Sequence, residues 1–152
     1  MALPNTFDKQ TTATSLTRLE SLQHNTQPKW GKMNAPQMLA HLNVTYDVAD
    51  GKIPVKSNFI MSFILKTFIK KIVTNEVAYQ KNARTAPQFL ITSEHDFEKE
   101  KQLMIQNIKK VETQGAAYFE GKHSDSFGPL TAKEWSNMFY KHLNHHFNQF
   151  GV

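Results

Sequence analysis

The sequence predicts an all-α protein, a bundle of four main helices with an additional helix in or near a longer crossover. Two observations lead to this prediction. Apolar residues recur at spacings of three and four along several segments, and residues that favour helix ends flank those segments. No segment alternates convincingly between apolar and polar side chains, as a half-buried strand would. With 152 residues, the chain is expected to form one domain, residues 1–152, with a hydrophobic core.

The first two helices are separated by the segment "NTQPKWGK", in which proline and glycine break the helical pattern. The first helix is expected over about residues 7–24, where leucines recur at steps of three. Asn34 is a good N-cap for the second helix, and Gln37 could complete a capping box. The second helix is therefore predicted over residues 35–49, with Gly51 after its end.

The middle of the chain is expected to hold two further helices around a long irregular stretch, "TNEVAYQKNARTAPQFLITS". Ser57 could cap a helix over about residues 58–73. Ser93 is the expected N-cap of the fourth helix in chain order, because acidic residues favoured by the helix dipole follow it. That helix is predicted to end at Gln114, with Gly115 in the position where glycine commonly terminates helices.

The last helix is predicted to begin after a capping box at Thr131, in "TAKE", and to continue to about Gln149. At about 100° per residue, His146 lies roughly 40° from His142 beside the apolar stripe, and His145 lies roughly 60° away on the other side. An HxxxH pair can direct two imidazole nitrogens at one ion. The alternative is a pair of surface or partly buried histidines near a helix C-terminus, where positive charge is favoured.

A metal site would need a third ligand, and the best candidate is His41. The chain contains no cysteine, so a disulfide or a thiolate site is excluded and the ligands must be His, Asp or Glu. His41 lies in the middle of the second helix beside its apolar stripe. It could equally be a hydrogen-bonded core residue. His24 and His95 are expected to be exposed, and His123 lies in a loop.

Composition limits the classes of partner. The net charge of +5 is modest and is spread among many carboxylates, so no nucleic-acid partner is expected. The N-terminal segment does not resemble a secretory signal, and the longest apolar run is interrupted by lysines, so we expect a soluble cytoplasmic protein without a membrane partner. The basic amphipathic segment near 58–73 could lie on a membrane surface. A helix that covers the bundle or contacts a second subunit is favoured. The second case would give a homodimer, but the sequence does not identify the number of subunits.

Two segments, "WGKMNAPQMLAHL" and "HLNHHFNQFGV", resemble the DinB/YfiT-like superfamily. The segments "NARTAPQFLITSEHDFEKEK" and "FGPLTAKEW" resemble, more narrowly, a branch described as a domain of unknown function. The resemblance implies an up-down-down-up four-helix bundle with a divalent metal, usually nickel or zinc, at one end. It also implies three histidine ligands that match His41, His142 and His146. The branch usually has proline after the loop histidine, whereas Ser124 follows His123 here, so no role is carried over to this loop.

The resemblance also suggests a reaction class. Characterised relatives use low-molecular-weight thiols and include bacillithiol or glutathione transferases and mycothiol-dependent isomerases. Three imidazoles would leave an open position on the ion, where a water or a thiol becomes a nucleophile near neutral pH. Because the chain lacks cysteine, a thiol would have to be a cosubstrate. We therefore expect a metal-dependent, thiol-dependent S-transferase acting on a small molecule, or a metal-assisted hydrolase. The alternative is a binding or structural protein in which the metal only fastens helices together.

Two other residues of the last helix, His145 and Gln149, are candidates for orienting a ligand or substrate, although an exposed position explains them equally well. The tryptophans Trp30 and Trp135 are expected in the core.

Overall fold

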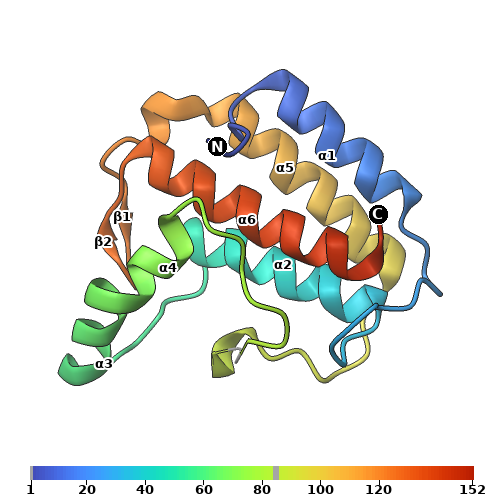
Figure 1. Ribbon diagram of the computed structural model, residues 1–152, viewed down its shortest axis with the longest axis horizontal. Coiled ribbons are helices and arrows are strands. Elements are labelled where there is room, and N and C mark those ends of the chain that lie inside the picture. The colour runs from blue at the N-terminus through green and yellow to red at the C-terminus, as the bar shows by residue number, and fades with distance from the viewer. Residues whose placement is uncertain (1, 84–85) are drawn as a thin grey trace.

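The computed structural model describes residues 2–83 and 86–152, and its regular structure is almost entirely helical (Figure 1). The all-α prediction is therefore confirmed, apart from a two-stranded antiparallel pairing of two residues each. Arg84 and Thr85, within the stretch expected to be irregular, lie outside the described residues. In chain order the elements are α1 (Lys9–Ser21), α2 (Ala35–Ala49), α3 (Phe59–Ile64), a π-helical turn (Leu65–Ile69), α4 (Lys70–Thr74), a 3₁₀ turn (Pro87–Phe89), α5 (Phe97–Phe119), β1 (His123–Ser124), β2 (Gly128–Pro129) and α6 (Ala132–Phe150).

The capping residues of α2 and α6 are those predicted. The Asn34 side chain accepts a hydrogen bond from the Gln37 backbone N–H at 2.9 Å, and the Gln37 side chain accepts one from the Asn34 N–H at 3.1 Å. Thr131 forms the same reciprocal arrangement at the start of α6. Each box satisfies N–H groups that have no partner within the helix. The two helices that carry the candidate ligands thus begin where the sequence indicates.

Two other helix boundaries were predicted wrongly. The helix α1 is shorter than residues 7–24, because the backbone is extended at Asp8 and again at Leu22. The helix α5 begins after Asp96, whose carboxylate accepts from the Lys99 N–H at 2.9 Å, whereas the Ser93 hydroxyl is hydrogen-bonded to His95 instead. Asp96 stands directly before the helical run, so its side chain reaches the free N–H that Ser93 cannot.

Gly115 interrupts α5 as expected, with φ of 71° and ψ of 171°, a conformation in the region that favours glycine. One further helical turn follows this break and continues to Phe119. The prediction that the helix ends at Gln114 was therefore right about the break and wrong about the end of the element.

Hydrogen bonds fix the relative directions of α2 and α5. Asn43 of α2 donates to Glu100 near the start of α5, at 3.0 Å to its carbonyl and 2.8 Å to its carboxylate. Asp50, just after α2, pairs with Lys110 of α5 at 2.6 Å. Residue numbers increase together along both helices, so α2 and α5 run in the same direction.

The helices α1 and α6 run in the opposite direction to that pair. Near the start of α5, Lys101 donates to the Leu22 carbonyl, just after α1, at 2.9 Å, so these two helices are antiparallel. Arg18, near the end of α1, donates to Asn144 at 2.7 Å and to the Val152 carbonyl at 2.7 Å, so the ends of α1 and α6 lie together. Figure 1 shows the same directions.

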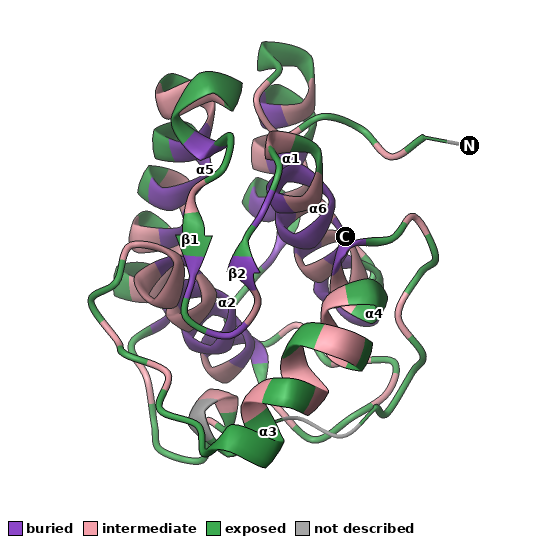
Figure 2. Cartoon of the chain, turned by 90° about the vertical axis from the view of Figure 1, so that its left-hand side faces the viewer, coloured by how far each residue is buried: buried purple, intermediate pink, exposed green. Residues whose placement is uncertain are grey.

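The core lies between these four long helices, where their apolar faces meet (Figure 2). Tyr46 of α2 stacks on Phe139 of α6 with ring centroids 5.0 Å apart. Burying a large apolar side chain stabilises the fold by about 1.5–3 kcal/mol. The largest side chains that are almost completely buried are Trp135, Phe119, Phe139, Phe147, Leu19, Leu22, Met38, Leu39, Leu42, Met104 and Leu130.

The helix expected over residues 58–73 is divided into α3, the π-helical turn and α4. Asn58, rather than Ser57, caps α3, because its side chain accepts from the Met61 N–H at 2.8 Å. Neither α3 nor the π-helical turn contains a buried residue. The helix α4 packs on α6, where Asn137 donates to the Thr74 carbonyl at 2.8 Å. The segment is therefore fastened at its C-terminal end. None of the helices described is long and apolar enough to cross a membrane.

Candidate metal centre

Three histidines from two helices meet in the structure. His41 is on α2, and His142 and His146 are on consecutive turns of α6. One nitrogen from each lies within 4.8 Å of the other two. The ring centroids form a nearly equilateral triangle, with sides of 4.8, 4.8 and 4.9 Å. The arrangement therefore directs three imidazoles at one common centre.

Two of the rings are oriented by hydrogen bonds on their outer sides. The Nδ1 of His41 donates to the Phe89 carbonyl at 2.8 Å, and the Nδ1 of His146 donates to Oε1 of Gln149 at 2.7 Å. The Gln149 amide is itself oriented, because its Nε2 donates to the Trp30 carbonyl at 2.6 Å. A carbonyl oxygen only accepts, so both Nδ1 atoms carry protons and both Nε2 atoms keep a lone pair in the neutral ring. Such outer partners hold metal-binding histidines in position.

The third ring, that of His142, contacts the hydroxyl of Thr45 on α2 and the ring of His41. Its Nδ1 lies 3.0 Å from Oγ1 of Thr45, and its Nε2 lies 2.8 Å from Nε2 of His41. When Thr45 donates to the Nδ1 of His142, the Nε2 of His142 carries a proton and donates to the Nε2 of His41. When His142 donates to Thr45 instead, two lone pairs face each other across that short distance. A cation between the nitrogens would replace this repulsion with two coordinate bonds. His142 is also the most accessible of the three, because His41 and His146 are only 5% and 7% exposed.

Burial keeps the three rings neutral, which is the form that binds metal ions. It lowers the pKa of His146 to about 3, an effect that the neighbouring His41 increases and the bond to Gln149 opposes. Burial also lowers the pKa of His142 well below its usual value, and the surrounding histidines lower it further. The pKa of His41 is lowered by burial too, although its bond to the Phe89 carbonyl opposes the shift.

The spacing of the nitrogens is suited to a small divalent ion. Zinc–nitrogen bonds of about 2.0–2.1 Å place two ligands of a tetrahedral ion roughly 3.3 Å apart. The separations between the nitrogens of the three histidines range from 2.8 Å up to 4.8 Å, so the shortest is below this value and the upper limit is above it. Within residues 2–83 and 86–152, these histidines form the only group of three or more His, Asp or Glu residues close enough to share an ion. The set therefore offers three potential ligands to one ion.

His145 lies beside the cluster without joining it, as the helical angles predicted. Its ring contacts the edges of Trp30 and Tyr79, with centroids 5.8 and 5.9 Å apart. Trp135 is 1% exposed, in the core as predicted, whereas Trp30 is only partly buried. The Trp30 indole Nε1 is shielded from solvent and has no hydrogen-bond partner among the described residues. His145, Trp30 and Tyr79 thus form an aromatic border to the histidine cluster.

Sequence reasoning missed two residues that orient the cluster. Thr45 is four residues after His41 and thus lies on the same face of α2, a spacing that was available as a signal. Phe89 contributes a backbone carbonyl from the 3₁₀ turn, and no side-chain pattern points to such a contact. The suggestion that Gln149 orients a ligand agrees with its hydrogen bond to His146.

The remaining histidines lie elsewhere. His24 is exposed, as expected, and packs against Phe97, while His123 is exposed on β1. His95 is less exposed than predicted. Its Nε2 is hydrogen-bonded to the Ser93 hydroxyl at 3.1 Å, and its Nδ1 lies 3.0 Å from the Glu100 carboxylate. These contacts run from Ser93 to His95 to Glu100, which is the order of nucleophile, base and acid in a catalytic triad.

The second Glu100 oxygen accepts from Asn43 of α2 at 2.8 Å, and Asn107 of α5 donates to Asn43 at 3.0 Å. Because this chain continues into the buried contact between α2 and α5, we interpret it as a fastening of the loop before α5 rather than as a catalytic group.

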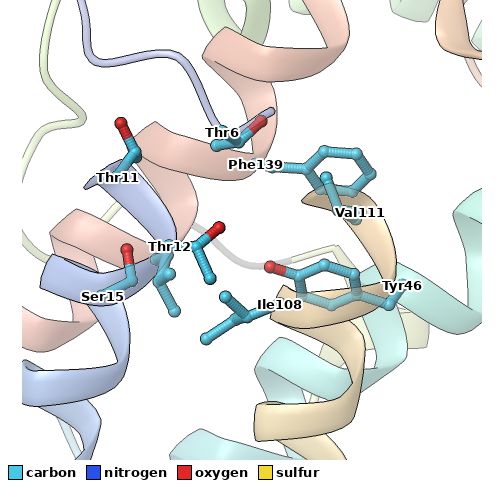
Figure 3. A pocket seen from close by; sticks show the side chains of 9 residues that line it. Thr6, Thr11, Thr12, Ser15, Tyr46, Ile108, Val111 and Phe139 are labelled. Carbon is cyan, nitrogen blue, oxygen red and sulfur yellow. The ribbon is translucent and has the colours of Figure 1, made fainter. Parts of the chain in front are cut away.

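Two hollows in the structure do not coincide with the histidines. One has a volume of about 10 Å³ and is lined by hydroxyls from Thr6, Thr12 and Ser15 and by Tyr46 (Figure 3). That volume is close to the minimum for a single water molecule. The other, of about 200 Å³, lies between the N-terminal segment, α1 and Tyr140. Neither contains a potential metal-ligand set, so the chemistry favours the histidine cluster as the functional site.

The helical fold and the histidine cluster together define a class of protein, a helical protein with a potential three-histidine metal site. Residues 4–151 match the family described as "Protein of unknown function (DUF1569)", and the chain belongs to that family. No curated protein and no solved structure showed a significant match to the chain.

Proposed function

We propose that the protein is a metal-dependent enzyme of the DinB-like superfamily, with one nickel or zinc ion held by His41, His142 and His146. Its proposed reaction is thiol-dependent S-transfer to a small molecule. One observation supports the site above all others. One nitrogen of each ring lies within 4.8 Å of the other two, and the Nδ1 of each ring is hydrogen-bonded to another group, so the three Nε2 atoms are the proposed ligands of the ion.

The proposed fold is a single up-down-down-up bundle with a crossover that contains α3 and α4. The hydrogen bonds between helices support it, because α1 and α6 run in one direction while α2 and α5 run in the other. In this proposed topology His41 of α2 lies beside His142 of α6, so proposed ligands that are about a hundred residues apart in sequence meet.

The chemistry derives from the donor set. Three neutral imidazoles leave the full charge of a divalent ion, which lowers the pKa of a bound thiol or water and so produces a nucleophile near neutral pH. The protein's own residues keep the rings neutral and oriented, and the partly exposed His142 marks the side from which a substrate approaches. Because the chain has no cysteine, the thiol must come from a small molecule. A water in place of the thiol would give the metal-assisted hydrolase.

A second candidate is a structural metal site, which one feature favours. The three ligands come from two neighbouring helices, α2 and α6, so an ion would fasten these helices to each other. The two proposals predict different effects of removing the metal. A structural site predicts loss of folding stability with no associated reaction, whereas a catalytic site predicts loss of turnover in a protein that remains folded.

The test is a thiol-transfer assay on tag-free protein loaded with zinc or nickel. Bacillithiol, glutathione and mycothiol are each supplied with monobromobimane, and the thioether is quantified by mass spectrometry against the uncatalysed reaction. We expect metal-dependent turnover with at least one thiol. His41→Ala should abolish it while far-UV circular dichroism is unchanged, and the neighbouring His145→Ala should retain metal.

A protein that binds the metal but accelerates no thiol reaction, and whose melting temperature falls sharply when the metal is removed, would contradict the transferase and favour the structural site. Ester hydrolysis that needs the metal but no thiol would favour the hydrolase.

A further inference from the structure

The excess positive charge of the chain lies in one segment. Residues 51–75 contain five of the 18 basic side chains and none of the 13 acidic ones, so the rest of the chain holds thirteen of each. The whole net charge of +5 therefore resides in 25 of 152 residues. Lys52 pairs with Asp47, and Lys70 pairs with Glu134. The other lysines of the segment, Lys56, Lys66 and Lys71, are exposed and have no ion pair within the described part of the chain.

Apolar side chains of the same segment project into solvent. Phe59 is 87% exposed and Ile60 is 71% exposed, values that are unusual for large apolar residues. The others that belong to this set are Met61, Phe63, Phe68 and Ile72, exposed by 47–59%. The segment therefore combines an uncovered apolar surface with uncompensated positive charge. We call it, from Phe59 to Ile72, the basic apolar face.

The fold holds the basic apolar face away from the core. Lys141 of α6 donates to the Ile72 carbonyl at 2.6 Å and to the Asn75 side chain at 2.7 Å, which fixes the C-terminal end of the segment. At the other end α3 buries none of its residues, and the chain before it is held by an exposed hydrogen bond, from the Val55 N–H to Asp125 at 3.3 Å. Figure 2 shows α3 at the edge of the molecule with exposed residues along it. The core does not cover this surface.

We propose that the basic apolar face docks on the surface of a bilayer that contains anionic phospholipid. Amphipathic helices with lysines and large apolar residues lie in the membrane interface, with apolar side chains at the acyl boundary and lysines at the headgroups. The alternative occupant is a second copy of the chain. A symmetric dimer through this face would place the same unpaired lysines opposite each other without any acidic side chain from the segment, and this like-charge contact disfavours it.

The contact with the membrane is peripheral, which is compatible with the absence of a spanning helix among the described elements. It would also place the histidine cluster near the bilayer, because Lys141, which anchors the segment, directly precedes His142. The proposal does not depend on the metal or on the thiol reaction, so either can fail without the other.

The test is sedimentation of the full-length, tag-free protein with sucrose-loaded vesicles. Vesicles of phosphatidylcholine alone are compared with vesicles that contain 30% phosphatidylglycerol, at about 0.1 M and 0.5 M NaCl. We expect binding to the anionic vesicles only and a fall of roughly tenfold or more in affinity at the higher salt. Phe59→Ser combined with Phe63→Ser should weaken binding by roughly tenfold or more. Because these side chains are exposed, the melting temperature should not fall.

Matched control variants distinguish an effect of the basic apolar face from an effect of net charge or of any exposed apolar side chain. Val77→Ser combined with Leu90→Ser removes two apolar side chains that are 69% and 58% exposed outside the face and should leave binding unchanged. Lys66→Glu combined with Lys71→Glu should abolish binding, whereas Lys9→Glu combined with Lys109→Glu, with the same net charge, should largely preserve it.

Three outcomes would overturn the proposal. The first is no sedimentation with anionic vesicles, and the second is equal loss of binding in the two charge-reversed variants. The third is a wild-type dimer, measured by light scattering without lipid, that becomes a monomer on Phe59→Ser with Phe63→Ser. That third result would assign the face to self-association instead.

Discussion

Gln149 connects the loop after α1 to the histidine cluster through two hydrogen bonds. It accepts from His146 and donates to the Trp30 carbonyl, so the direction of one side-chain amide decides which His146 nitrogen faces the centre. Gly31 leaves space for this amide. A Cβ on Gly31 would lie 2.5 Å from Nε2 of Gln149, on a backbone with φ of +84° that favours glycine. The imidazole is thus oriented by residues that lie more than a hundred positions away in the sequence.

The first prediction concerns this orientation. Gln149→Ala should weaken zinc binding by about 10- to 100-fold, the usual effect of losing a partner that orients a metal-binding histidine. Gly31→Ala should weaken it in the same direction by displacing the amide. Competitive titration against a chromophoric chelator measures both, with His145→Ala as the control that should bind like wild type. Unchanged affinity in Gln149→Ala would show that His146 does not need this support or is not a ligand.

The second prediction concerns pH. The pKa of His146 is about 3 in the folded, metal-free protein and close to 6.5 when the chain is unfolded. Between these values the unfolded state binds more protons, so the free energy of unfolding should rise with pH and fall on acidification. From pH 6.5 to 5 the loss should be about 1.5–2 kcal/mol for this residue.

His146→Gln, which cannot titrate, should show a smaller decrease over the same range, before the carboxylates begin to protonate. Thermal melts of the metal-free proteins at pH 6.5, 5.75 and 5.0 measure the two slopes, and equal slopes would contradict the assignment.

The grouping of His41, His142 and His146 followed from helical angles and a family resemblance, because all three lie inside helices that the sequence defines well. The contacts that orient these three histidines were harder to predict from the sequence. Phe89 reaches His41 through its main chain, and its position depends on how the stretch between α4 and α5 folds back. A periodic pattern carries no information about that path. Metal binding itself stays a prediction.

At the scale of elements, capping side chains decided which boundaries were predictable. Reciprocal capping boxes fixed the starts of α2 and α6, whereas single candidates at Ser57 and Ser93 were each replaced by a later residue, Asn58 or Asp96. The π-helical turn between α3 and α4 was not predicted, since the sequence "LKTFI" is compatible with an ordinary helix. Local sequence therefore predicts strongly capped helices and leaves weakly packed ones uncertain.

The third prediction concerns these caps. Asn34→Ala should lower the free energy of unfolding by about 1 kcal/mol, because it leaves helix N–H groups of α2 without a partner. Asn58→Ala removes the corresponding bond from α3, which buries no residue, so its effect on global unfolding should be much smaller. Urea denaturation followed by circular dichroism compares the two. Equal destabilisation would mean that α3 unfolds together with the core.

The fourth prediction concerns the anchor of α4. Lys141 is 3% exposed, and burial lowers its pKa to about 8. Lys141→Met keeps the apolar contacts but leaves the Ile72 carbonyl and the Asn75 side chain without their donor. Hydrogen exchange should therefore become faster in residues 65–75, while α2 and α5 keep their protection. Loss of protection throughout the chain would show that this anchor supports the whole fold rather than one segment.

At the scale of the whole molecule, the chain separates two surfaces. A helical core with equal numbers of basic and acidic residues carries the histidine cluster, while one segment with all the excess positive charge projects from it. The long helices could be predicted because their apolar faces are continuous. The position of the projecting segment could not, because an amphipathic helix has the same pattern whether the core, a second subunit or a membrane covers it.

The central claim is that imidazoles from α2 and α6 bind one ion, and metal stoichiometry tests it most directly. Tag-free protein, purified without chelators and incubated with zinc or nickel, is desalted and analysed by inductively coupled plasma mass spectrometry together with His41→Ala, His142→Ala and His145→Ala. We expect one ion per chain in the wild type and in His145→Ala, and a loss of bound metal in the other two variants while all four proteins keep their helical content. Wild-type protein without bound metal, or full retention of the metal in His41→Ala and His142→Ala, would contradict it.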